Sequence, residues 1–177
     1  MRYKSIDELN SISLTDARMK SFEMSEENNV ITLAVEGAVV LAGNSQNEYY
    51  ADKYTDLMQI RFLKPVIEAI LLEGHKYYDA NDTLIEQVPD IQIAPDEYKK
   101  IMKKFEEQYI FYGGIPKEKV VQDYVNQTGL NKTDGMNCYQ MIIDIEEDSY
   151  VVSFYYEKAI AEWEHFLNKA NMGSVQI

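Results

Sequence analysis

The amino-acid sequence predicts an α+β fold in which an antiparallel β-sheet built from hairpins packs with about three amphipathic helices. Two apolar stretches that turn back around short polar tips predict the hairpins. Three stretches with apolar residues three and four positions apart predict the helices. A chain of 177 residues fits a single globular domain, 1–177, because a domain of this size buries a sufficient core without disulfide bonds.

The first hairpin is predicted for residues 17–24 and 30–40, around the tip SEENN, because β-branched residues are frequent in its second limb. The second is predicted for residues 138–145 and 150–157, around EEDS, where the run YVVSFYY is rich in aromatic side chains. The two hairpins share a pattern when one is shifted by 121 positions. Hairpin geometry alone requires apolar limbs and a polar tip, so we favour two similar hairpins over an internal duplication.

The stretch between the hairpins carries both the strand and the helix spacing of apolar side chains. Residues 55–63 are predicted as a strand. Residues 66–78 and 83–88 are predicted as a hairpin around DAND, because Asp and Asn tolerate the backbone angles of tight turns. The alternative is a helix over residues 66–73 that is closed by Gly74.

The clearest helix is predicted to begin at Pro95, because proline suits the first helical position. Its apolar stripe consists of Tyr98, Ile101, Met102 and Phe105. A second helix is predicted from Pro116 to a cap at Gly129. A third is predicted to begin near Lys158. Its apolar side would carry Ile160, Trp163 and Leu167.

The composition favours some classes of partner over others. Thirty acidic against seventeen basic side chains give a formal charge of −13, which repels nucleic-acid phosphates and attracts a basic protein. The first ten residues lack the apolar run of a signal peptide. The most apolar stretch contains Glu36 and is shorter than the roughly 18 residues of a membrane span. We therefore expect a cytoplasmic, bacterial-type protein that binds neither nucleic acid nor membranes.

No motif predicts catalysis, a metal or a cofactor. The single cysteine, Cys138, is expected to be a buried structural residue. Glu162 and His165 form one E-x-x-H, and a di-iron site needs a second. The run DANDTLIEQVPD, which starts at Asp79, resembles a calcium loop but lacks its glycine and its final glutamate, so a plain turn is expected.

Two further features point to binding. Fourteen tyrosines are unusual, and tyrosine suits recognition surfaces because a rigid apolar ring carries a polar tip. The stretch LTDARMKSFEMSEENNVITLAVEGAVVL, residues 14–41, resembles the opening hairpin of small acidic bacterial immunity proteins, with Asp16 at the position of their aspartate. Thr15 stands where these proteins have histidine. The resemblance implies a protein that binds and neutralises a toxin domain.

The leading hypothesis is a non-catalytic protein-binding module, an immunity-type inhibitor whose acidic face binds a basic protein. The face is predicted to consist of Glu146, Glu147, Asp148, Glu162 and Glu164. The first alternative is a small-molecule-binding or hydrolytic domain. Its pocket is predicted to be lined by His75, Tyr77 and Trp163. The second alternative is a structural subunit of a homo-oligomer.

Overall fold

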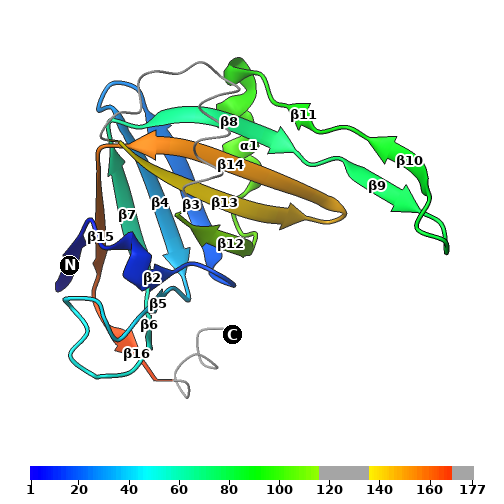
Figure 1. Cartoon of the computed structure of the whole chain (residues 1–177). Helices are drawn as coiled ribbons and strands as arrows, with labels where there is room; N and C mark the ends of the chain where they lie inside the picture. Colours follow the sequence, from blue (N-terminus) through cyan, green and yellow to red (C-terminus); the bar gives the residue numbers. More distant parts are fainter. Residues whose placement is uncertain (116–135, 169–177) are drawn as a thin grey trace.

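The computed structural model describes residues 1–115 and 136–168 (Figure 1). Strands that pair antiparallel hold 55% of these residues. Apart from a single turn of 3-10 helix at Leu9–Ser11, the described residues contain one helix, of 10 residues. The fold is therefore mostly antiparallel β-sheet, and the predicted α+β arrangement with about three helices is wrong.

Two large antiparallel sheets of five strands each form the body of the molecule. The strands of the first sheet are, in spatial order, β1 (Tyr3–Ile6), β15 (Lys158–Trp163), β7 (Met58–Leu63), β4 (Val30–Glu36) and β3 (Arg18–Ser25). The strands of the second sheet are β11 (Ile91–Gln92), β8 (Val66–Leu72), β14 (Asp148–Tyr156), β13 (Asn137–Ile145) and β12 (Ile110–Gly114). The strands of the second sheet run across those of the first in Figure 1.

The two sheets are joined along both sides. On one side the chain passes from β7 into β8 through Lys64 and Pro65, and from β14 into β15 through Glu157. On the other side Arg18 and Tyr109 form a bridge next to the edge strands β3 and β12. The sheets therefore enclose one hydrophobic core between them.

Alternating side chains fill this core. In β4, Ile31, Leu33 and Val35 are fully buried, while the residues between them are half-buried, as expected for a strand with one face against a core. Aromatic rings occupy the centre. The ring of Phe62 lies 4.7 Å from that of Phe154 in an edge-to-face contact, measured between ring centroids.

Two smaller sheets contain the remaining strands. A four-stranded sheet at the lower end of Figure 1 consists of β16 (Phe166–Leu167), β6 (Lys53–Thr55), β5 (Val39–Val40) and β2 (Ile12–Ser13). A two-stranded ribbon consists of β9 (His75–Tyr78) and β10 (Leu84–Val88). This ribbon projects from the body, and we call it the arm (Figure 1).

The helix predicted at Pro95 is confirmed. A 3-10 turn, Pro95–Glu97, leads into α1, Tyr98–Lys104, which packs against β3. The buried residues of its stripe include Ile101 and Met102, and Phe105 follows directly in the core. Proline at the start and lysines in the last turn both favour a helix at this place.

The helix predicted to begin near Lys158 is wrong. Residues Lys158–Trp163 form β15, which pairs with β7 on one side and β1 on the other. Ala159, Ala161 and Trp163 alternate along the buried side of this strand, so the segment carries a period of two as well as the helical spacing. Pairing with β7 and β1 selected the strand over the helix. The predicted helix from Pro116 to Gly129 lies outside the described residues.

The predicted hairpins are confirmed. Strands β3 and β4 pair from Arg18–Glu36 to Ser25–Val30, and β13 pairs with β14 along its whole length. The prediction of a hairpin after Pro65 is also confirmed, since β8 and β9 are strands and β10 pairs with β9. The alternative helix over residues 66–73 is therefore wrong.

Candidate functional site

The arm is the continuation of a hairpin that starts inside the second sheet. Strand β8 pairs with β14 up to Leu72 and Tyr150, and the N–H of Glu73 then donates to the carbonyl oxygen of Ser149 at 2.8 Å. Beyond this bond the β13–β14 hairpin ends and β9 continues outward. All four residues of β9 are exposed. A two-stranded ribbon without a covering layer is only marginally stable in water.

The register of the arm assigns its side chains to two faces. Directly opposed residues of an antiparallel pair share a face, and His75 pairs with Val88 while Tyr77 pairs with Glu86. These residues form the inner face. Lys76 pairs with Gln87 and Tyr78 with Leu84 on the outer face.

A cleft of about 570 Å³ lies between the inner face of the arm and the tip of the β13–β14 hairpin. Its walls come from three places in the sequence. They consist of Leu72, Glu73, His75, Tyr77, Val88, Pro89, Ile91, Glu147 and Asp148. Within the cleft the rings of His75 and Tyr77 meet edge to face, with their centroids 4.7 Å apart. Carboxylates and aromatic rings therefore share one open cleft.

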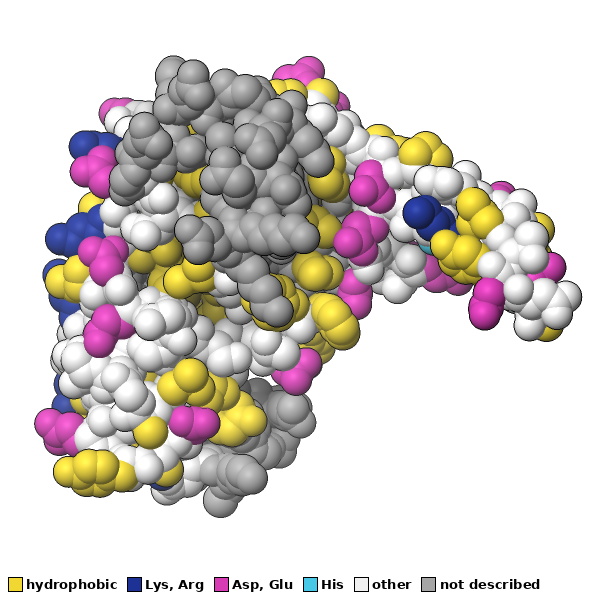
Figure 2. Space-filling view, in the orientation of Figure 1, with side chains coloured by type: hydrophobic (Ala, Val, Ile, Leu, Met, Phe, Trp, Pro, Cys, Tyr) yellow, Lys and Arg dark blue, Asp and Glu magenta, His cyan; other side chains and the backbone are white. Residues whose placement is uncertain are grey.

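The cleft is negatively charged. Glu73, Glu147 and Asp148 contribute carboxylates, and no lysine or arginine is among the described residues that line it. None of the three carboxylates forms an ion pair with another residue of the described part of the chain. Figure 2 shows acidic side chains gathered where the arm leaves the body. A cation brought into the cleft would meet unpaired carboxylates and aromatic faces, both of which attract it.

The five acidic residues predicted as one face are divided between two places. Glu147 and Asp148 line the cleft, and Glu146 precedes them in the same hairpin tip. Glu162 lies in β15 and binds Arg61 through an ion pair of 2.9 Å. Glu164 follows β15, with its carboxylate 4.0 Å from the amino group of Met1. The structure therefore brings the first three together and separates them from the other two.

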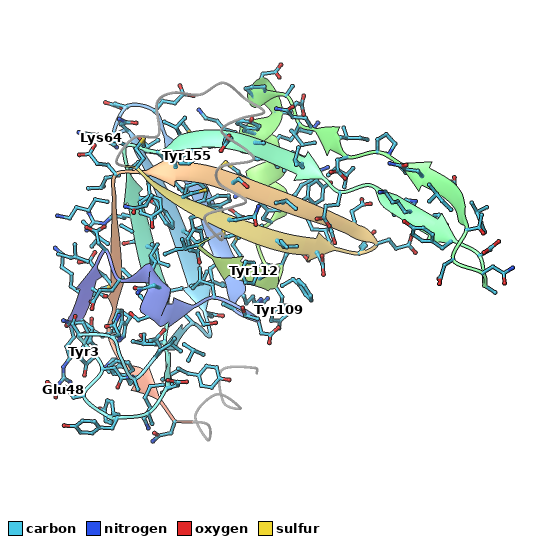
Figure 3. The ribbon with its side chains drawn as sticks, viewed as in Figure 1. Tyr3, Glu48, Lys64, Tyr109, Tyr112 and Tyr155 are labelled. Atoms are coloured by element: carbon cyan, nitrogen blue, oxygen red, sulfur yellow. The ribbon has the colours of Figure 1, made fainter. Side chains whose placement is uncertain are left out.

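The predicted small-molecule pocket is divided in the same way. His75 and Tyr77 line the cleft, whereas Trp163 is fully buried in the first sheet. The indole of Trp163 stacks on Tyr3 with ring centroids 5.6 Å apart, and Figure 3 labels Tyr3 at the end of the molecule away from the arm. His75 and Tyr77 line the same cleft as Glu147 and Asp148, which the sequence-based prediction had assigned to a different site.

Sequence reasoning missed Glu73 and the residues of β10 and β11 that complete the cleft. The signal that could have found them is the length of the limbs. The limb predicted for residues 66–78 has 13 residues, which is longer than the strand of residues 150–157 beside which it lies. A strand that extends beyond its neighbour projects from the sheet. Acidic residues at that point then lie next to the end of the neighbouring strand.

The cysteine and the E-x-x-H motif of the sequence have structural surroundings in the fold. Cys138 is buried, and burial together with the negative charge of Glu68 raises the pKa of its thiol to about 12, which disfavours the reactive thiolate. His165 of the E-x-x-H binds Asp56 at 2.9 Å while Glu162 binds Arg61, so the two residues serve separate contacts. No group of three or more metal-ligating side chains that could hold an ion occurs in the described ranges.

The calcium-like run is a turn. One carboxylate oxygen of Asp79 accepts from the N–H groups of Asn81 at 2.8 Å and Thr83 at 2.9 Å. These backbone donors hold the pKa of Asp79 below its ordinary value. The carboxylate therefore closes the tip of the arm.

No helix in the described ranges has the length and apolar character needed to cross a membrane. Comparison with protein-family models, curated proteins and solved structures finds no match to this chain.

Proposed function

We propose that this chain is a non-catalytic protein-binding module that binds a basic protein through the cleft between the arm and the β13–β14 hairpin. The observation that carries the proposal is the set of three carboxylates, Glu73, Glu147 and Asp148, that line the cleft without a cationic partner among the described residues. Some acidic side chains elsewhere have such partners, as in the ion pairs of Glu162 with Arg61 and of Glu157 with Lys64, whereas the three in the cleft converge on one concave site without one.

The electrostatics of the whole chain support the same partner. A formal charge of −13 steers a basic protein toward the molecule, and unpaired carboxylates at the contact raise the association rate and discriminate against acidic partners. The rings of His75 and Tyr77 add faces on which a guanidinium or ammonium group stacks.

We further propose that the module is an immunity-type inhibitor, whose partner is a toxin domain. The support is the resemblance of residues 14–41 to the opening hairpin of such proteins. In the fold this stretch contains β3 and β4, and the N–H of Asp16 donates to the carbonyl oxygen of Ile110 at 2.8 Å.

The test starts with affinity capture from native lysate, using the tagged full chain as bait, with washes at low and high salt. We expect a stoichiometric basic protein that is lost at high salt. Its affinity is then measured for the cleft variant, E73Q/E147Q/D148N, and for a control variant, E27Q/E48Q/D96N. Both variants change the net charge by the same amount, and the control residues are exposed and lie outside the cleft. Glu48 is labelled at the end of the molecule away from the arm in Figure 3.

We expect the cleft variant to lose about tenfold or more in affinity and the control variant to lose much less, since close carboxylates contribute more than distant ones. Equal losses in the two variants would show that only net charge matters and would refute the cleft as the site. An empty bait at both salt concentrations would refute the partner and favour the small-molecule alternative, which a ligand screen by melting temperature then examines. Loss of the captured protein's toxic activity on binding would support the inhibitor role.

A further inference from the structure

Strand β9 has an unpaired edge. It pairs with β10 on one side, and no described strand pairs with it on the other. Inside the second sheet its predecessor, β8, has a neighbour on both sides, β11 and β14. The change occurs after the bond from Glu73 to Ser149, where β14 begins. An unpaired edge offers a row of N–H and carbonyl groups to another chain.

The ladder of the arm indicates which backbone groups face this edge. The N–H of Asp79 donates to the carbonyl oxygen of Thr83 at 2.9 Å, so the backbone of Asp79 points toward β10. Backbone groups of an antiparallel strand alternate in direction, and the irregularity of this pair lies within β10, between Leu84 and Glu86. The N–H and carbonyl groups of Lys76 and Tyr78 therefore point to the unpaired side.

This edge borders the cleft. His75 and Tyr77 of β9 form one wall, and Glu147 and Asp148 form the other at the start of β14. A strand that paired with β9 would therefore lie in line with β14, as its continuation across the cleft. Every second side chain of that strand would point to the same side as the inner face of the arm, into the cleft that the carboxylates line.

We propose that the partner inserts an extended, lysine- or arginine-rich segment that adds as a strand to the unpaired edge of β9. Its backbone pairs with Lys76 and Tyr78, and its basic side chains enter the cleft toward Glu73, Glu147 and Asp148. This inference rests on the proposed function and adds to it the conformation of the bound segment. Strand addition supplies affinity through the main chain, and the cleft supplies selectivity for basic side chains.

Charge complementarity favours a basic segment over a second copy of this chain. Residues 73–92 contain five acidic side chains and one basic side chain, Lys76. Two arms paired edge to edge would bring these acidic groups together between molecules that each carry a formal charge of −13. Like charges placed opposite each other across a strand pair are destabilising.

The probe is a display library of random linear peptides, selected at low salt on the immobilised full chain. We expect the selected peptides to contain Lys or Arg at alternate positions. Binding of one selected peptide is then measured by calorimetry with the wild type and with Lys76→Pro and Lys76→Ala. Both substitutions remove the charge of Lys76, but only proline removes the N–H that faces the edge. We expect Lys76→Pro to bind about tenfold more weakly than Lys76→Ala, the effect of one lost hydrogen bond.

A scan of the peptide with single N-methyl amides examines the same bonds with the protein unchanged, which keeps the test valid if Lys76→Pro disturbs the arm. Loss of binding at every second amide supports strand addition. Insensitivity of the scan, with binding still lost in E73Q/E147Q/D148N, overturns strand addition but leaves the proposed function in place. Insensitivity to both refutes both proposals.

Two other results also overturn the inference. One is a selection that yields peptides without Lys or Arg. The other is a dimer of the free chain, detected by sedimentation velocity and removed by Lys76→Pro, because the edge would then belong to a second copy.

Discussion

The N–H of Glu73 donates to the carbonyl oxygen of Ser149 at 2.8 Å, and this bond marks the place where the second sheet ends and the arm begins. On one side of it β8 is held between two strands. On the other side β9 has only β10. A single long hairpin therefore changes from a part of the second sheet to an exposed ribbon within two residues. The cleft lies at this transition.

The position of the arm depends on Gly74. A Cβ at this residue would overlap the carbonyl oxygen of Val88 and the backbone of Pro89, and backbone atoms cannot move aside as a flexible side chain can. We expect Gly74→Ala to displace the arm at a cost of about 1–3 kcal/mol. Because the arm is attached only at its base, the effect should be local. Hydrogen exchange should show at least about tenfold lower protection in residues 75–88 and unchanged protection in β13 and β14.

Gly43→Ala is the matched control for this substitution. A Cβ at Gly43 meets nothing within 4 Å, so the change should leave exchange throughout the chain as in the wild type. Equal protection of the arm in Gly74→Ala and the wild type would contradict the role given to Gly74.

The aromatic centre of the core depends on Phe62. This ring is fully buried and lies within 5.5 Å of the rings of Tyr139, Phe154 and Tyr156, measured between centroids. We expect Phe62→Ala to lower the free energy of unfolding by about 3–5 kcal/mol, because the substitution leaves a cavity that the surrounding rings cannot close. Urea unfolding measured by tryptophan fluorescence checks the value.

Tyr50→Ala is the comparison for the core variant. The side chain of Tyr50 is 96% exposed, so the free energy of unfolding should change by less than about 0.5 kcal/mol. A loss below about 1 kcal/mol in Phe62→Ala would mean that the sheets close around the missing ring.

Asn47 holds the loop between β5 and β6. Its amide nitrogen donates to the carbonyl oxygens of Val40 at 3.0 Å and Ala51 at 2.9 Å, and its amide oxygen accepts from the N–H of Tyr49 at 2.9 Å. We expect Asn47→Ala to cost about 1–3 kcal/mol, because the substitution leaves the buried carbonyl group of Val40 and two partly buried backbone groups without this partner. Asn47→Asp should cost more, since a carboxylate would face two carbonyl oxygens. Thermal unfolding of the two variants checks the order, and a more stable Asn47→Asp would contradict it.

Stability should decrease in alkaline solution. Burial, with the negative charge of Glu68, raises the pKa of Cys138 to about 12, and burial, with the negative charge of Asp7, raises that of Tyr156 to about 12. In the unfolded chain both groups ionise at lower pH. Their contribution is therefore complete below the unfolded pKa values and is lost as the pH rises toward about 12.

Cys138→Ala separates the two contributions. Removing one such group should reduce the slope of the unfolding free energy against pH by about 1.4 kcal/mol per pH unit above the unfolded pKa. Urea unfolding at a series of alkaline pH values measures the slope. A slope that Cys138→Ala leaves as steep as in the wild type would refute the assignment of this thiol.

Local patterns predicted the hairpins and the helix at Pro95, but they gave the wrong fold class, in part because the segment after Lys158 was predicted as a helix. The run Lys158–Trp163 satisfies helical spacing, yet its alternation of Ala159, Ala161 and Trp163 fits a strand equally well, and pairing with β1 and β7 selected the strand. A segment of six residues is too short for its period alone to decide.

The candidate site was predicted only in part. Glu146, Glu147 and Asp148 are neighbours in a hairpin tip, so their proximity is a local property that the sequence carries. Glu162 and Glu164 were grouped with them on the basis of charge alone, and the structure places both elsewhere.

By itself, the sequence determined the β3–β4 and β13–β14 hairpins and the helix at Pro95, because period-two alternation, polar tips and a proline at the first helical position act within a few residues. Only the tertiary structure decided that β8 continues past the end of β14 and forms the arm and its cleft. That outcome depends on the register of two strands far apart in the chain, which pairs Leu72 with Tyr150, and long-range register is set by how both strands pack against a shared core.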